Sequence, residues 1–265
     1  ISETIEDIYG FEVSEGMVSD ITDKLLPRIE EWQNRPLSPV YPIVFIDAVH
    51  FSVRDDGVIR KLAAYVVLGM NEDSWDRLLK IRTSGRDDTG SDRYKYPYEP
   101  TPYSVLERLG NSGEIGKKNT VLDYGCGKGR VDFFLSYQTG CNSIGIEYNE
   151  RFYQTALRNQ KKAVSSGKVC FVQQDAAAYQ VPAQVDRCFF FNPFCLEILK
   201  QAMARILESW YENQRELRLY FYYPSQEYEV YLNGLDELQY EGAVNCMDLF
   251  PGNNMREKIL IFSLL

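Results

Sequence analysis

The pattern of apolar and polar residues changes near residue 98. Beyond it, short apolar runs alternate with longer stretches in which apolar residues recur every three or four positions. Short runs are typical of buried strands, and the longer spacing is typical of helices packed on one face. Strands are predicted at 121–124, 143–147, 168–174, 185–191, 217–223, 238–246 and 258–264. Helices are predicted between them at 104–110, 131–137, 150–166, 196–210 and 225–235.

Alternating strands and helices predict an α/β fold, in which a mostly parallel sheet carries helices on both faces. Ligands of such sheets bind at the carboxyl ends of the strands. Four polar residues stand at predicted strand ends and are therefore candidates for a binding site: Asp123, Glu147, Asp175 and Asn192.

The front of the chain has a different pattern. A helix is predicted at 2–9, and a second helix is predicted to begin after Ser14, whose hydroxyl can cap it. Pro27 lies inside the second helix and is expected to kink or split it. Two apolar stretches, 41–53 and 58–70, flank a polar turn and predict a β-hairpin.

The stretch between these two parts is polar and rich in Gly, Ser and Asp. This composition predicts a linker. The expected organisation is a front segment of residues 1–81, a linker of residues 82–97 and a second domain of residues 98–265.

Composition narrows the possible functions. The 265 residues are 45% hydrophobic, enough for one large domain or two small ones. The net charge is −9, and the acidic excess lies mainly in residues 1–81. A bulk nucleic-acid binder usually carries a basic excess, so this class is disfavoured, although a local basic patch remains an alternative.

Cysteine and histidine usage limits disulfide and metal chemistry. The six cysteines form no C-x-x-C pair and are interpreted as small buried residues in a reducing compartment, which favours a cytoplasmic protein. His50 is the only histidine, so a histidine-based metal cluster would need other ligands. No apolar run has the length of a membrane span. The acidic start has no signal-peptide shape, and the chain is expected to begin inside a longer reading frame.

The most informative stretch, residues 121–130, reads VLDYGCGKGR. Its glycines allow a tight turn and the close approach of a ligand, and the following helix points free N–H groups at that ligand. Asp123 ends the strand before the turn, and Glu147 closes the next strand, where a carboxylate can accept both hydroxyls of a ribose. The alternatives are a turn that merely needs glycines, and a dinucleotide site, whose usual spacing is G-x-G-x-x-G.

An acidic residue followed by G-x-G-x-G resembles the first motif of the class I S-adenosylmethionine-dependent methyltransferases. The resemblance covers residues 98–265 and implies a Rossmann-like sheet of seven strands, with the last strand antiparallel. It also implies S-adenosyl-L-methionine as the cofactor. The implied cofactor-binding residues are Tyr98, Thr101, Asp123, Gly125, Cys126, Gly127, Glu147, Asp175, Ala176 and Asn192.

The resemblance gives two pairs of these residues specific roles. Tyr98 and Thr101 belong to an aromatic-Pro-Thr segment that is expected to fold over the methionine end of the cofactor; a helix start that uses proline is a compatible interpretation. Asp175 and Ala176 match the place where the family contacts the adenine amino group. The alternative role of Asp175 is to cap the next helix.

Asn192, Pro193 and Phe194 resemble the Asn/Asp-Pro-Pro-Tyr/Phe motif of amino-group methyltransferases. In that motif the Asn and Pro carbonyls accept hydrogen bonds from the target nitrogen, and the aromatic ring packs on the substrate. We therefore expect these three to be the catalytic residues of N-methyl transfer to an amine or amide. The second proline of the motif is missing here, so an O- or C-methyltransferase acting on a small metabolite is the alternative.

Residues 1–81 resemble the Mutator-type insertion-sequence transposases. The resemblance is carried by motifs that include Tyr9-Gly10, Trp32, Arg35-Pro36-Leu37 and Tyr41 to Ala48. It implies part of an RNase H-like α+β domain, in which three acidic residues bind divalent metal. Only the first of them has a match, Asp47. One carboxylate cannot hold two metal ions, so we expect a truncated fragment with no metal site and no strand transfer.

These observations predict an enzyme, an S-adenosylmethionine-dependent methyltransferase with a transposase fragment in front. Its expected partner is a methyl-acceptor substrate of unknown class; nucleic acid and membranes are not expected to bind the methyltransferase domain. Two alternatives without catalysis stay open: a cofactor-binding module that has lost its acceptor pocket, and a transposase-derived DNA-binding protein.

Overall fold

The computed structural model describes residues 14–33, 43–55, 58–70, 72–88 and 96–265. The chain divides into two compact units, Ile1–Tyr41 and Pro42–Leu265. The first unit contains helix α2, Glu15–Gln33. Ser14 caps it as predicted, because its hydroxyl accepts a hydrogen bond of 3.2 Å from the Met17 amide. The helix runs through Pro27 as one element, and the predicted helix at 2–9 lies outside the described residues.

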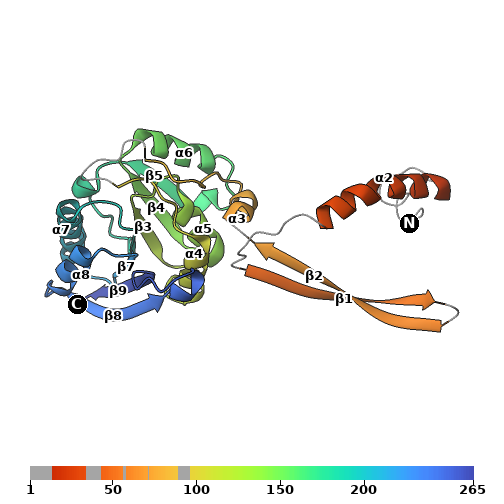
Figure 1. Ribbon diagram of the computed structural model, residues 1–265. Helices are drawn as coiled ribbons and strands as arrows, with labels where there is room; N and C mark the ends of the chain where they lie inside the picture. The colour runs from red at the N-terminus through yellow and green to blue at the C-terminus, as the bar shows by residue number, and fades with distance from the viewer. Residues whose placement is uncertain (1–13, 34–42, 56–57, 71, 89–95) are drawn as a thin grey trace. The chain divides into compact units, whose positions relative to one another are not determined.

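The predicted β-hairpin is confirmed. Strands β1, Ile43–Asp55, and β2, Val58–Met70, form an antiparallel two-stranded sheet in which Asp47 stands opposite Val66. Both strands lie in the part of the chain that precedes the large sheet, and they appear in orange in Figure 1.

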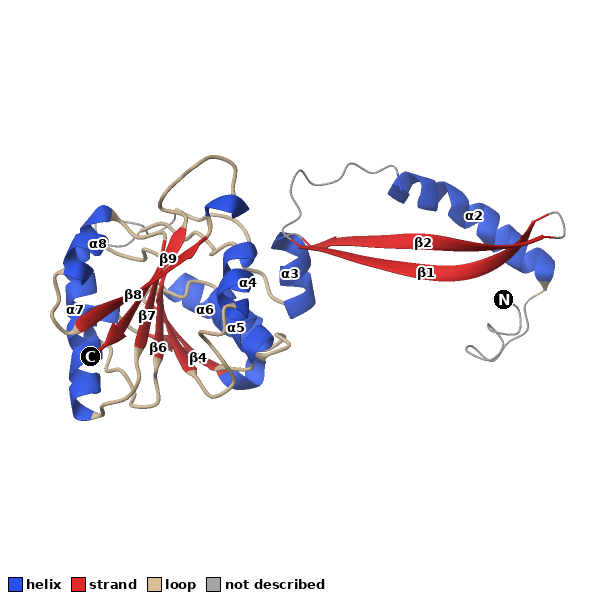
Figure 2. Ribbon diagram, turned by 90° about the horizontal axis from the view of Figure 1, so that it is seen from below, coloured by secondary structure: helices blue, strands red, loops and turns tan. Residues whose placement is uncertain are grey.

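The second unit also contains a sheet of seven strands (Figures 1 and 2). The strand order is β5-β4-β3-β6-β7-β9-β8. Only β9 runs against its neighbours β7 and β8, so the predicted sheet, with its last strand antiparallel, is confirmed. The strands are β3, Thr120–Tyr124; β4, Asn142–Glu147; β5, Val169–Gln173; β6, Arg187–Phe190; β7, Arg218–Tyr222; β8, Leu238–Asn245; and β9, Lys258–Leu264.

Helices cover both faces of this sheet. They are α3, Glu72–Leu79; α4, Tyr103–Asn111; α5, Arg130–Thr139; α6, Glu150–Gln160; α7, Leu196–Glu212; and α8, Gln226–Asn233. Figure 2 shows α7 and α8 on one side of the sheet and α4, α5 and α6 on the other. Predicted and observed ends agree closely, except that the helix predicted to reach residue 166 ends at Gln160.

Two hydrophobic cores follow from the alternation of side chains along the strands. Val121 on β3 faces the core that contains Phe133 and Phe134 of α5. Its neighbour Leu122 faces the opposite core, which contains Met203 of α7. Successive residues of one strand therefore bind the helical layers to the two faces of the sheet.

The strand order reverses beside β3. The chain passes from β3 to β4 and β5 on one side, and then returns to place β6 on the other side of β3. A crevice forms at the carboxyl ends of the strands at such a reversal, and it is the usual ligand site of α/β sheets. The glycine turn follows β3 directly and therefore lies at this point.

Helix α3 was not among the predicted helices. It begins with Glu72 and Asp73, acidic residues that favour a helix N-terminus. Trp75 and Ile81 are buried in the same core as Phe134, and the Trp75 and Phe134 rings meet edge-on with centroids 5.0 Å apart. The domain boundaries at residues 82 and 98 stay predictions. Trp75 and Ile81 precede the first of these boundaries, yet they are buried in the same hydrophobic core as helix α5.

Candidate functional site

A cavity of about 550 Å³ opens at the carboxyl ends of the central strands. This volume lies within the range typical of small-molecule sites, roughly 300 to 1,000 Å³. All the cofactor-binding and catalytic candidates named from the sequence line it: Tyr98, Thr101, Asp123, Gly125, Cys126, Gly127, Glu147, Asp175, Ala176, Asn192, Pro193 and Phe194. The structure thus brings these residues together, and their individual roles stay predictions.

The glycine turn needs glycine at two positions for a steric reason. Gly125 has φ +75°, and a Cβ there would lie 2.7 Å from the Cβ of Pro193. Gly127 has φ +58°, and a Cβ there would overlap the ring of Tyr98. Both positions therefore favour glycine through backbone conformation and through space. The turn thus runs in direct contact with the predicted lid and the predicted acceptor loop.

The carboxylate of Glu147 is held in place by backbone amides. It accepts hydrogen bonds from Gly127 N at 2.9 Å and from Asn149 N at 2.7 Å, one on each oxygen. Glu147 is thereby fixed beside the glycine turn, as a ribose-binding carboxylate requires.

A buried pair of carboxyl groups lies beneath the turn. Burial raises the pKa of Asp123 well above its usual value, and the nearby charges of Asp132 and Glu147 raise it further. Burial also raises the pKa of Asp132 to about 7, against the lowering effect of the Ser143 hydroxyl, which donates to it at 2.7 Å. We interpret Asp123 as the protonated partner, since two like charges this close and this buried oppose each other's ionisation.

Asp175 caps a short helical turn. Its Oδ1 accepts a hydrogen bond of 3.0 Å from Ala177 N, at the start of the 3₁₀ helix η2, Ala176–Ala178. The capping alternative is therefore observed. Because Asp175 and Ala176 also line the cavity, capping and contact with a ligand are compatible roles.

The loop after β6 carries the sharpest anomaly of the site. Asn192 has φ +41°, a conformation that few non-glycine residues adopt. Its side-chain Oδ1 is buried and has no hydrogen-bond partner within the described part of the chain. Strained backbone and unsatisfied buried polar atoms both cluster at functional sites. The role of Asn192 toward a ligand stays a prediction, and these two features are the observations that bear on it.

The neighbours of Asn192 differ from the expectation in two details. The carbonyl of Pro193 already accepts a long hydrogen bond, 3.4 Å, from Tyr96 N, although a carbonyl oxygen retains a second acceptor position. Phe194 lines the cavity, but it is only 5% exposed and its ring meets Phe190 in the core. Most of the Phe194 ring therefore serves packing.

One wall of the cavity is aromatic, and its residues were missed from the sequence. Phe191 and Tyr222 lie with ring centroids 4.7 Å apart, and the guanidinium of Arg256 lies 4.1 Å from the Tyr223 ring. The Tyr222 hydroxyl donates to Glu257 at 2.6 Å, and burial, with this hydrogen bond, raises the pKa of Tyr222. Position at the end of the predicted strand 217–223 was the available signal, but a run of aromatic residues in a strand is more typical of sheet core than of a binding surface.

The described ranges contain no group of three or more His, Cys, Asp or Glu residues that could hold a metal ion. Within the same ranges, no helix combines the length and apolar character needed to cross a bilayer.

Two family models match different parts of the chain. Residues 1–91 match the transposases of the Mutator family, and residues 121–215 match a methyltransferase domain. A probable transposase for an ISRM3-like insertion sequence from Sinorhizobium fredii is 45% identical over 77 residues, which cover 29% of this chain and 19% of the transposase. The corresponding ISRM3 transposase of Rhizobium meliloti is 43% identical over 77 residues. The chain thus spans about a fifth of the length of these transposases.

A protein-lysine N-methyltransferase from Saccharolobus islandicus is 30% identical over 113 residues, which cover 42% of this chain and 70% of that protein. Similar solved structures include an RNA methyltransferase from Salinibacter ruber, at 17% identity and TM-score 0.44, covering 63% of this chain and 94% of that one. Another is a TehB-like S-adenosylmethionine-dependent methyltransferase from Corynebacterium glutamicum, at 18% identity and TM-score 0.46, covering 73% and 95%.

The cavity fits the cofactor of such enzymes, because it has the volume of a small-molecule site at the carboxyl ends of the central strands and Glu147 is oriented beside its glycine turn. The match to the methyltransferase model, the identity to the Saccharolobus protein and the order of the strands in the sheet all indicate the same family. The chain belongs to the class I S-adenosylmethionine-dependent methyltransferases and carries a segment of the Mutator transposase family at its front.

Proposed function

We propose that this chain transfers the methyl group of S-adenosylmethionine to an amine nitrogen, and that a lysine side chain of a protein is the acceptor. The carrying observation is Asn192, a residue of the cavity lining whose buried Oδ1 has no hydrogen-bond partner among the described residues. A nitrogen that still bears N–H groups supplies the missing donor. The lysine substrate of the Saccharolobus relative favours the same class of acceptor.

The residues that would hold the cofactor line one side of the cavity. Glu147 would accept hydrogen bonds from the ribose hydroxyls, and Asp175 with Ala176 would face the adenine. Tyr98 and Thr101 would cover the methionine end. When bound, the cofactor supplies a methyl group on a positively charged sulfur, so the protein's main contribution is alignment of the acceptor.

Asn192 and Pro193 would orient the acceptor nitrogen. Two carbonyl oxygens that accept the N–H groups of the neutral amine, formed when the ammonium releases a proton to water, would leave its lone pair directed at the methyl group. The contact between Pro193 and Gly125 sets this loop directly against the cofactor's turn. Acceptor and cofactor are thus brought to one place by two adjacent strand ends, those of β3 and β6.

The aromatic wall suits a cationic side chain. Ammonium groups are attracted to aromatic faces and to carboxylates, and Tyr222, Phe191 and Glu257 offer both at the cavity. The long methylene stem of lysine could pass along the apolar ring faces while its nitrogen reaches Asn192. A lysine acceptor would therefore use both the aromatic rings and the carboxylate of this wall.

The test is product analysis. The full chain would be incubated with methyl-labelled S-adenosylmethionine and denatured cell protein, whose lysines are either intact or blocked by prior acetylation. We expect label in protein as N-methyllysine, and its loss after acetylation. Label that survives acetylation, or that appears only in small molecules as O-methyl or C-methyl groups, would contradict the proposal. If the chain binds the cofactor but methylates none of these acceptors, the result would favour the non-catalytic module.

A further inference from the structure

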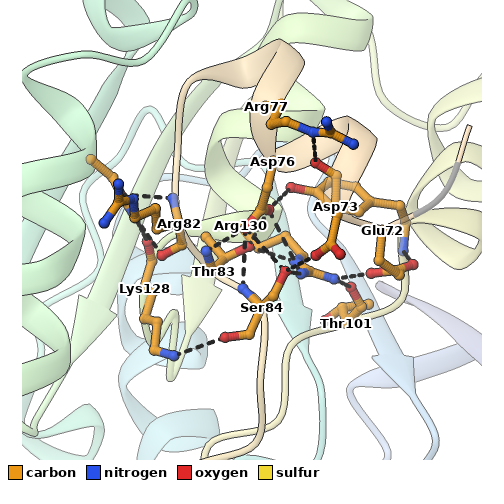
Figure 3. Close-up of polar contacts among 12 residues, drawn as sticks. Glu72, Asp73, Asp76, Arg77, Arg82, Thr83, Ser84, Thr101, Lys128 and Arg130 are labelled. Carbon is orange, nitrogen blue, oxygen red and sulfur yellow. Dashed lines mark hydrogen bonds and ion pairs between the residues drawn. The ribbon is translucent and has the colours of Figure 1, made fainter. Parts of the chain in front are cut away.

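Arg130 is buried at the junction between the glycine turn and helix α5. It is 3% exposed and follows Gly129 directly. Its Nε donates to Thr83 Oγ1 at 2.7 Å, and its Nη1 donates to the Thr101 carbonyl at 3.2 Å. Its guanidinium also pairs with Glu72. Figure 3 shows these groups converging on the arginine from three separate parts of the chain.

Asp76 supports the same centre from α3. It is 7% exposed, and its carboxylate lies 3.7 Å from Arg130 Nη2. It accepts hydrogen bonds of 2.6 Å from the amide and the hydroxyl of Thr83, and another of 2.6 Å from the Tyr103 hydroxyl. A buried pair of opposite charges persists only when its remaining polar positions are satisfied, as they are here.

The same residues hold the predicted cofactor lid. The Tyr98 hydroxyl donates to the Thr83 carbonyl at 2.6 Å, while its ring occupies the space in front of Gly127. The ammonium of Lys128, within the turn, lies 4.3 Å from the Tyr98 ring centre and donates to the Ser84 carbonyl at 3.3 Å. Residues 72–84, which we call the clasp, therefore contact both the lid and the turn.

We propose that the clasp is part of the cofactor site, and that Arg130 is the positioning residue that fixes Tyr98 and Thr101 over the glycine turn. The clasp lies inside the 1–91 match to the Mutator family, so residues shared with a transposase would do structural work for a methyltransferase. The cofactor-binding unit would then begin near residue 72 instead of residue 98. This proposal rests on cofactor binding and is independent of the acceptor.

The test uses point variants of the full chain and S-adenosylhomocysteine as the probe. Arg130→Lys keeps the charge but loses the planar fork that reaches Thr83 and Thr101 together. Arg187→Lys is the matched control, because Arg187 is also buried and donates to the Glu114 carbonyl at 3.0 Å, but does not line the cavity. Calorimetric titration would give the dissociation constants, and thermal unfolding would report folding.

We expect Arg130→Lys to weaken binding by roughly tenfold or more, and Arg187→Lys to leave it within about twofold even where both lower the melting temperature. A double-mutant cycle then separates positioning from general stability. Tyr98→Phe removes the bond to Thr83, and its effect on binding should be non-additive with Arg130→Lys. Asp175→Asn changes a cavity residue that caps η2 instead, and it should be additive with Arg130→Lys.

Two results would overturn the proposal. One is an unchanged dissociation constant in Arg130→Lys. The other is an additive Tyr98 and Arg130 cycle, which would show that the arginine does not act on cofactor binding through Tyr98. If Arg130→Lys does not fold, Thr83→Val replaces it in the cycle, because it removes the Oγ1 contact and keeps the carbonyl that Tyr98 uses.

Discussion

The amide of Gly127 donates a hydrogen bond of 2.9 Å to Oε2 of Glu147. This bond joins the glycine turn after β3 to the last residue of the neighbouring strand β4. It orients the carboxylate before any ligand arrives, which reduces the entropy that binding must otherwise overcome.

Glu147→Ala should weaken binding of S-adenosylhomocysteine by at least about tenfold, because hydrogen bonds to a charged group contribute roughly 1.5–3 kcal/mol each. The affinity of Glu147→Gln should lie between that of the unaltered chain and that of Glu147→Ala, since its one amide oxygen can still accept a hydrogen bond from a hydroxyl. Calorimetric titration of folded protein measures this. An unchanged dissociation constant in Glu147→Ala would restrict Glu147 to bracing the turn.

The variant Asn192→Gly tests the contribution of the Asn192 side chain separately from that of its backbone conformation. Glycine adopts the positive φ of this position freely, so the variant removes the buried Oδ1 while the loop keeps its conformation. We expect turnover to fall by roughly two orders of magnitude with little change in cofactor affinity, because only acceptor orientation is lost. Asn192→Asp, which keeps an acceptor oxygen, should retain more activity. Equal turnover in Asn192→Gly and the unaltered chain would mean that Asn192 does not orient the acceptor.

The buried carboxyl pair predicts a pH dependence of stability. The folded-state pKa values of Asp123 and Asp132 are raised, the latter to about 7, so the folded chain holds protons that the unfolded chain releases. Stability from this source is full below the ordinary carboxyl pKa and is lost as pH rises through about 7. Asp132→Asn keeps an acceptor for Ser143 and removes the titrating group. Between pH 5 and pH 8, the free energy of unfolding of this variant should therefore fall less than that of the unaltered chain, by an amount on the order of 1 kcal/mol or more.

Denaturant unfolding at several pH values, without cofactor, measures this effect. Glu107→Gln is the required control, because burial also raises the pKa of Glu107 to about 7 and contributes a slope of the same sign. An unchanged slope in Asp132→Asn, with the slope abolished in Glu107→Gln, would assign the pH dependence to Glu107.

Asp47→Ala should leave methyl transfer unchanged, and the unaltered chain should not nick DNA with magnesium. Asp47 has no second or third acidic partner from its family's motif in this sequence, and two metal ions need several carboxylates. Plasmid nicking assays with and without Mg²⁺ test this. Nicking by the purified chain that disappears in Asp47→Ala would show that the truncated segment retains catalysis.

The sheet and the cavity could be predicted because their signals are local. Apolar runs specify the strands, and strand ends specify where Asp123, Glu147 and Asn192 must gather. Even the capping of α2 by Ser14 is a matter of adjacent residues. These features depend on short-range patterns that one sequence contains in full.

The clasp could not be predicted in this way. Thr83 is fully buried in a stretch whose composition is typical of a linker, because distant groups on Arg130, Asp76 and Tyr98 satisfy its polar atoms. Helix α3 has only eight residues, too few for a clear periodicity. Tyr222 was missed for the complementary reason. Its ring is core, as its pattern indicates, while its hydroxyl reaches Glu257 in the loop that precedes β9.

The placement of Tyr98 bears on the speed of repeated turnover. Its ring lies against the turn and lines the cavity, and its hydroxyl is bonded to the Thr83 carbonyl. If Tyr98 covers the cofactor as the lid prediction expects, a spent cofactor molecule would leave after that bond opens. Departure of the product, rather than the methyl transfer, would then limit the steady-state rate, as in many enzymes whose ligands are enclosed by a loop. Rapid-quench kinetics would show this as a burst of methylated product in the first turnover.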